Sequence, residues 1–211
     1  MQHIHPATIA IILVNVLFSL KGFNDFSFFE KFKFNIAGIR RGEQIRMFTS
    51  GFLHVDYSHL LFNMLTLYFF ADVVIFEVGV SKFILIYLLS LIVGNLLSLY
   101  FHKDEYHYSA VGASGAVMGI IYSAILLGPI TNTIYFMPAW LFGLLYLMYS
   151  IYGMQKRLGN IGHDAHFGGA IAGYLITIAF KPELIDEKLW LIGVLAIPIL
   201  VLFVLYKLGK I

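Results

Sequence analysis

Seven long apolar segments, separated by short polar connections, constrain this chain more than any other feature. A helix that crosses the hydrocarbon core of a bilayer needs about 17–25 mostly apolar residues. The chain is 60% hydrophobic and only 12% charged, whereas about a quarter of the residues in a soluble domain are charged. We therefore expect an all-α polytopic membrane protein. The predicted spans cover residues of about 6–20, 57–78, 81–101, 114–127, 138–154, 165–180 and 189–206.

The ends and connections of these segments predict one membrane domain over residues 1–211, with a core over about 6–180 and an extra C-terminal span over about 189–206. The N-terminus lacks the Lys or Arg of a signal peptide, which predicts that the first segment remains as a span. The long connection over residues 21–56 mixes Lys and Arg with many Phe side chains. This composition suits the headgroup region, so we expect the connection to lie against or partly within the membrane.

Two of the segments carry pairs of glycines at the small-xxx-small spacing, which lets helix backbones approach closely. The pairs are Gly115 with Gly119, and Gly169 with Gly173. Ser114 directly precedes the first pair, and His166 precedes the second pair by three residues, on the same helical face. The pattern predicts that a serine and a histidine meet where two tightly packed helices begin.

The order of the segments places further polar residues at the same depth. The second, fourth and sixth spans cross in the same direction, so all three start at one membrane face. His59 and Asn63 lie near the start of the second span, one helical turn apart on one face. Because the rise is about 1.5 Å per residue, they share a shallow depth with Ser114 and His166.

These residue types suit acyl transfer. A serine hydroxyl becomes a useful nucleophile when a base removes its proton, and imidazole is the usual base near neutral pH. His59, Asn63 and the backbone N–H of Ser114 are candidate donors to the oxyanion that forms. Asp164 lies two residues before His166 and would point to another side of the helix. The sequence therefore indicates a dyad rather than a triad.

With these motifs the chain resembles the rhomboid intramembrane serine proteases. The resemblance rests on Gly112-x-Ser114-Gly115, His166-x-x-Gly169-x-x-x-Gly173, His59-x-x-x-Asn63, and Arg46 followed by residues leading to His54. It implies a rhomboid-like six-helix core, a Ser114–His166 dyad and an oxyanion hole at His59 and Asn63. It also implies a partly inserted loop after the first span and a water-filled cavity that opens to one side.

Two positions depart from the family pattern. Ile45 precedes Arg46 where the family usually has Trp. Met118 stands four residues after the serine, where an aromatic residue often stacks on the histidine. A thioether can also pack against an imidazole ring.

Each candidate residue also has a plain structural interpretation. Ser114 alone would more often bond its own backbone, and His59 with Asn63 could simply bond across helices. Arg46 and His54 are interpreted as loop organisers, and Asn95 as a structural residue. Burial of several polar groups at one depth in a membrane costs free energy. Taken together, these residues therefore indicate a functional site rather than separate structural roles.

The composition excludes several other chemistries. The chain has no Cys, so disulfides, thiolate metal sites and a cysteine nucleophile are excluded. No His-Glu-x-x-His pattern is present, so we expect no metal and no cofactor. A net charge of +2 without a basic cluster does not predict nucleic-acid binding.

The charge distribution disagrees with the family orientation. With a cytoplasmic N-terminus, the cytoplasmic side holds only Lys82, Lys181 and Lys188, and the other eleven Lys and Arg residues fall outside. The positive-inside rule would reverse this orientation. We follow the resemblance, which implies a multi-pass protein of the plasma membrane. In a bacterium this would be the inner membrane. The active site would open to the extracytoplasmic side.

The predicted function is therefore an intramembrane serine endopeptidase that cleaves single-span membrane proteins in or near the transmembrane segment. An alternative is a catalytically inactive rhomboid-like protein that binds membrane helices, although such relatives typically lack the serine or histidine. A transporter would require discontinuous spans and paired repeats, which the sequence does not show. The sequence does not specify the substrate, the oligomeric state or the role of the seventh span.

Overall fold

The structure is a computed structural model, and it describes residues 4–134, 136–156 and 162–211. It is mostly helical, with two short antiparallel strand pairs, which confirms the predicted all-α polytopic class. The long helices are α1 (Pro6–Asn24), α5 (Tyr57–Val78), α6 (Val80–Phe101), α7 (Ser114–Leu127), α8 (Ala139–Lys156), α9 (His163–Phe180) and α11 (Leu189–Lys207). The short elements are α2 (Phe26–Phe32), β1 (Phe34–Asn35), α3 (Ile36–Arg40), α4 (Arg46–Thr49), the 3-10 helix η1 (Ser50–Phe52), β2 (Ser109–Ala110), β3 (Thr133–Ile134), β4 (Met137–Pro138) and α10 (Leu184–Glu187).

A helix therefore occupies each of the seven predicted segments. Four of them, α1, α5, α6 and α11, are long and apolar enough to cross a membrane. Their outer faces carry large exposed apolar side chains such as Leu17, Leu61, Phe69 and Leu200, as expected for helices that face lipid. The helix α7 is apolar but shorter.

The first helix is longer than predicted, because it continues past Leu20 to Asn24. Lys21 forms an ion pair with Asp25, at 2.8 Å between Nζ and Oδ2. Asp25 also accepts a hydrogen bond from the backbone N–H of Phe28 and so caps α2. The polar residues that suggested a loop therefore form the junction between two helices.

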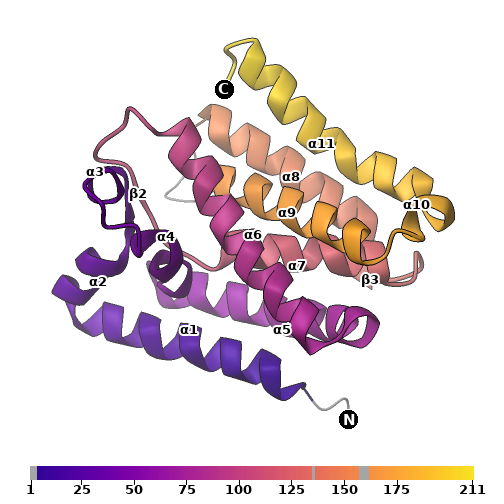
Figure 1. Cartoon of the computed structure of the whole chain (residues 1–211), viewed down its shortest axis with the longest axis horizontal. Helices are drawn as coiled ribbons and strands as arrows, with labels where there is room; N and C mark the ends of the chain where they lie inside the picture. The colour runs from indigo at the N-terminus through magenta and orange to yellow at the C-terminus, as the bar shows by residue number, and fades with distance from the viewer. Residues whose placement is uncertain (1–3, 135, 157–161) are drawn as a thin grey trace.

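The helix α7 lies at the centre of the molecule. Figure 1 shows it behind α6 and between α5 and α9, and it packs against all three. Every residue of α7 except Ser114 is buried. The serine thus lies at the end of a buried helix, where it lines a pocket.

Glycines allow α7 and α9 to touch along their backbones, as the small-xxx-small spacing predicts. A methyl group at Gly169 would overlap the carbonyl oxygen of Gly115, and one at Gly173 would overlap that of Gly119. Farther along this contact, Ser123 Oγ donates to the carbonyl of Gly119, at 2.8 Å. The contact fixes the distance between the two helices that carry Ser114 and His166.

The C-terminal end of α7 is stabilised by a contact with the start of α11. The helix ends at Leu127, as predicted, and Gly128 is its C-cap. The ammonium of Lys188, at the start of α11, donates to the carbonyl oxygens of Leu126 and Gly128, both at 2.8 Å. A cation at this end interacts favourably with the helix dipole. The seventh helix is therefore tied to the serine helix as well as packed on α8.

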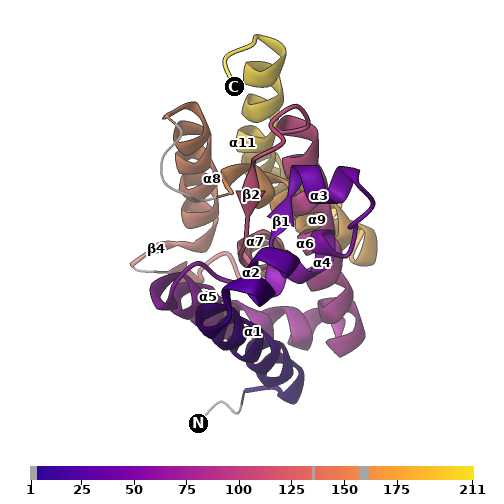
Figure 2. The same cartoon turned by 90° about the vertical axis from the view of Figure 1, so that its left-hand side faces the viewer.

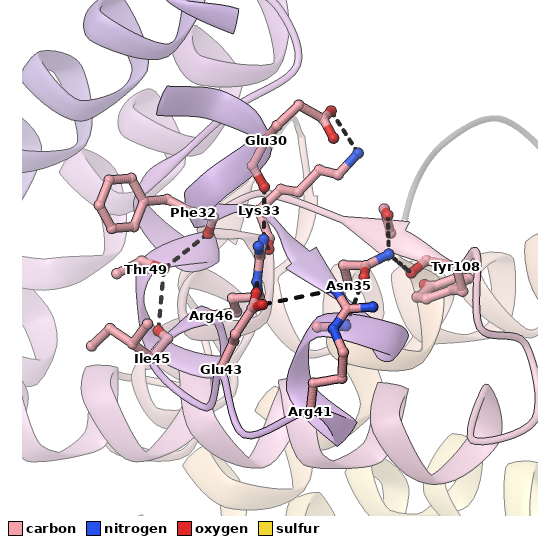
Figure 3. Close-up of polar contacts among 12 residues, drawn as sticks. Glu30, Phe32, Lys33, Asn35, Arg41, Glu43, Ile45, Arg46, Thr49 and Tyr108 are labelled. Atoms are coloured by element: carbon pink, nitrogen blue, oxygen red, sulfur yellow. Dashed lines mark hydrogen bonds and ion pairs between the residues drawn. The ribbon is translucent and has the colours of Figure 1, made fainter. Parts of the chain in front are cut away.

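The connection between α1 and α5 folds as a compact unit at one end of the molecule, where α2, α3 and α4 gather beside the β1–β2 pair (Figure 2). Figure 3 shows Arg46 at its centre. Its guanidinium bonds the carboxylate of Glu43 and donates to the carbonyls of Glu30, at 2.7 Å, and Lys33, at 3.0 Å. Arg46 therefore organises the loop, as predicted, although the preceding Ile45 is exposed.

Candidate active site

Ser114 is the first residue of α7, and the turn before it requires glycine. Gly112 has a φ of +136°, a region that side chains rarely adopt. A Cβ at Gly112 would also lie 2.6 Å from Cε1 of His59 and 3.7 Å from Ser114 Oγ. The glycine thus allows the His59 ring to lie directly beside the turn that carries the serine.

His166 lies in the first turn of α9 and is almost completely buried, with 2% of its surface exposed. Its Nδ1 atom is 3.2 Å from Ser150 Oγ on α8. Its Nε2 atom has no hydrogen-bond partner among the residues that the structure describes. Among those same residues, no hydrogen bond joins Nε2 to Ser114. A nucleophile–base pair often closes only when substrate is bound, so this geometry is compatible with catalysis.

One pocket of about 620 Å³ brings the predicted site residues together. It lies where α5, α7, α8 and α9 meet, and its wall includes His59, Asn63, Ser114, Met118 and His166. Gly115, Gly169 and Gly173 do not line it, because they form the helix contact behind it. The polar residues predicted to share one depth therefore share one cavity.

The two residues predicted for the oxyanion hole hold different positions in this wall. Asp56 caps α5 by accepting a hydrogen bond from the backbone N–H of His59, at 2.7 Å, which places His59 in the first turn. One turn later, Asn63 donates its Nδ2 hydrogen to the carbonyl of His59, at 2.9 Å. The Asn63 amide thus bonds its own helix at the pocket wall.

His54 connects the first helix to the serine turn. Its Nε2 accepts a hydrogen bond from the backbone N–H of Ala113, at 3.4 Å, so Nδ1 carries the proton and donates to Ser19 Oγ, at 2.9 Å. Ser19 in turn donates to the carbonyl of Phe52, at 3.0 Å. Burial lowers the pKa of His54 to about 3, so the ring is neutral at physiological pH. The interpretation of His54 as an organiser is confirmed, and it reaches the residue next to the serine.

Asp164 points away from His166, as its position two residues earlier predicted. Tyr108 donates its hydroxyl hydrogen to Asp164 Oδ1, at 3.3 Å, and His102 Nε2 lies 3.7 Å from the same oxygen. The rings of His102 and Tyr108 stack at 3.6 Å. This carboxylate fastens the start of α9 to the connection after α6.

The aromatic neighbour of His166 comes from an unexpected helix. The ring of Tyr146 on α8 lies 5.4 Å from the imidazole ring, between centroids. Tyr146 and Ser150 are one turn apart on α8, and neither was predicted as a site residue. The chain direction could have indicated them. Because α8 runs opposite to α7 and α9, the C-terminal end of α8 lies at the face where those two helices begin.

The sequence profile of the Rhomboid domain matches residues 41–183, which is more than half of the chain. This chain belongs to the rhomboid family. The predicted resemblance is confirmed, and the matched region includes every residue proposed for the site. Together with the apolar helices of span length, membership makes the chain a multi-pass membrane protein.

Several curated proteins are similar to this rhomboid chain. Rhomboid protease GluP of Bacillus subtilis is 31% identical over 141 residues, which is 67% of this chain and 27% of that protein. Putative rhomboid protease YdcA of the same species is 29% identical over 66% of this chain and 69% of that protein. The mitochondrial Rhomboid protein 1 of Saccharomyces cerevisiae is 31% identical over 63% of this chain and 40% of that protein. This chain therefore spans less than half the length of GluP and of the yeast protein.

Proposed function

We propose that this chain is an intramembrane serine endopeptidase with Ser114 as nucleophile and His166 as base. The observation that carries the proposal is the shared pocket, in which Ser114, His166 and His59 come from three different helices. Nε2 of His166 has no hydrogen-bond partner among the described residues, and we assign to it the lone pair that accepts the serine proton. Two similar proteins, GluP and YdcA, carry the word protease in their names.

The proposed reaction proceeds through an acyl-enzyme. Ser114 Oγ attacks the scissile carbonyl carbon while its proton passes to His166 Nε2. The C–N bond then breaks, and Nε2 returns the proton to the leaving amine. Water attacks the ester, gives a proton to Nε2, and the acid leaves as Ser114 regains its hydrogen.

The oxyanion would form at the start of α7. Backbone N–H groups in the first turn of a helix lack internal partners and favour a negative charge. We assign the Ser114 N–H to this role, together with the His59 ring and the Asn63 amide, which line the same pocket. Asn63 would have to exchange its bond to the His59 carbonyl for one to the oxyanion.

The side-chain donors can be tested separately from the nucleophile. His59→Ala and Asn63→Ala should each lower kcat by about 10²-fold, because each removes one donor to the oxyanion. In both variants, the labelling of Ser114 by a serine-directed probe should decrease by a smaller factor than the rate of substrate cleavage. Cleavage at the unchanged rate by both variants would remove these residues from the oxyanion hole.

The proposed substrates are single-span membrane proteins. A peptide bond inside a helix hides its carbonyl in the hydrogen-bond ladder, so the substrate must unwind locally at the pocket. The test is incubation of the purified chain in lipid vesicles with a single-span protein that carries small or helix-breaking residues near the cut. Specific cleavage supports the proposal. Tight binding of the substrate without cleavage would indicate the inactive, helix-binding alternative.

We also propose that the site opens to the extracytoplasmic side of a plasma membrane. In a bacterium, this membrane would be the inner membrane. The chain has no Cys, so single cysteines report topology cleanly. Ser109→Cys, exposed in β2 near the start of α7, should react with an impermeant maleimide on intact cells. Thr131→Cys, exposed beyond the other end of α7, is the matched control and should react only after permeabilisation. The reverse pattern would invert the orientation.

A further inference from the structure

The helix α8 contacts the His166 imidazole at two points. Ser150 Oγ lies 3.2 Å from Nδ1, and the Tyr146 ring lies 5.4 Å from the imidazole ring. Ser150 is completely buried and His166 is 2% exposed. The Nδ1 side of the ring therefore lies in the protein interior, beside the Ser150 hydroxyl.

The Nδ1 side of a catalytic histidine decides which nitrogen can act as the base. Nε2 accepts a proton from Ser114 only when the proton of the neutral ring is on Nδ1. In a Ser-His-Asp triad a buried carboxylate holds the ring in this form. Here Asp164 bonds Tyr108 instead, and no carboxylate among the described residues is hydrogen-bonded to His166.

We infer that Ser150 is a positioning residue for the reaction, and this inference rests on the proposed function. Its hydroxyl oxygen accepts the hydrogen of His166 Nδ1–H, which holds the ring with a free lone pair on Nε2 at the pocket. When Nε2 takes the proton, the same bond strengthens, because Nδ1–H then belongs to a cation. Ser150 thus holds the ring in one orientation and favours the transient imidazolium over the neutral ring.

Packing supports this assignment. Tyr146 and Ser150 are one helical turn apart, so they lie on the same face of α8. From this face the Tyr146 ring contacts the imidazole ring, and the Ser150 hydroxyl contacts its Nδ1 atom. Among the described residues, the titratable groups near His166 are His163 and Asp164 on α9, Tyr146 on α8 and His59 on α5. Among the described residues, Nδ1 is hydrogen-bonded to Ser150 Oγ, at 3.2 Å.

The test compares Ser150→Ala with Ser123→Ala in vesicles. Ser123 is also a completely buried serine, but it bonds the carbonyls of Gly119 and Gly173 and does not line the pocket. Ser150→Ala should lower kcat about tenfold with KM unchanged, because orientation of the base supplies part of a general-base contribution of about 10²–10⁴-fold. The ascending limb of its pH profile should move to lower pH, because the lost bond is stronger to the protonated ring.

Ser123→Ala should leave the pH profile where the wild-type chain has it, whatever it does to thermal stability. If Ser150→Ala matches the wild-type chain in both kcat and pH profile, the positioning role is wrong. If the wild-type chain itself cleaves nothing and reacts with no serine-directed probe, the proposed function fails instead. The two failures are therefore distinguishable in one set of assays.

Discussion

Replacement of Ser114 by Ala is expected to reduce cleavage of a single-span substrate by more than about 10³-fold while the fold survives. Ser114 is the only residue of α7 that is not buried, so removal of its hydroxyl leaves the helix packing intact. Without Oγ no acyl-enzyme forms, and the pocket retains only its donors. Initial rates in vesicles, with thermal unfolding measured alongside, provide the check.

His166→Ala should have an effect of similar size, because the serine then has no base. The double variant should be no slower than either single variant, since residues that act as one unit are not additive. Ser123→Ala is the matched control, because it deletes a buried hydroxyl from the same helix away from the pocket. If Ser114→Ala cleaves as fast as this control, the assignment of the nucleophile is wrong.

The second large effect is structural and comes from Gly169. A single methyl there would overlap the carbonyl oxygen of Gly115, which is backbone and cannot rotate away. Gly169→Ala should therefore force α7 and α9 apart and lower the free energy of unfolding by about 3 kcal/mol. Activity should fall as well, because this contact sets the separation of Ser114 and His166. Thermal unfolding in detergent and cleavage in vesicles are the measurements.

Gly193→Ala is the control for this change. It makes the same substitution within a long apolar helix, α11, where a Cβ would meet no atom within 4 Å. It should leave stability unchanged or raise it by up to about 1 kcal/mol, because Ala is the better helix former. Equal stabilities for the two variants would contradict the account of the α7–α9 contact.

Much of the fold could be predicted because the boundaries of the long helices are local. Pro6 starts α1 and Gly128 ends α7, as their chemistry predicts. The shared depth of His59, Ser114 and His166 followed from the direction of alternate spans, and they line one pocket. These features depend on spacing and chain direction, which the sequence contains.

The remainder depends on tertiary contacts that spacing does not reveal. Arg46 binds backbone carbonyls of Glu30 and Lys33, and any residue type offers a carbonyl. Ser150 looks like an ordinary serine in an apolar helix, and its partner His166 is sixteen residues away on another helix. The family pattern pointed to residue 118 for the aromatic neighbour, whereas Tyr146 on α8 supplies it.

The most direct measurement of the central claim is the reaction of the wild-type chain with a fluorophosphonate or isocoumarin probe, with the modified residue located by mass spectrometry. Such probes acylate or phosphylate a serine only when a base activates it. The account predicts modification of Ser114 alone among the serines, and no modification in His166→Ala. An unmodified Ser114 in folded wild-type chain, or equal modification in His166→Ala, would contradict it.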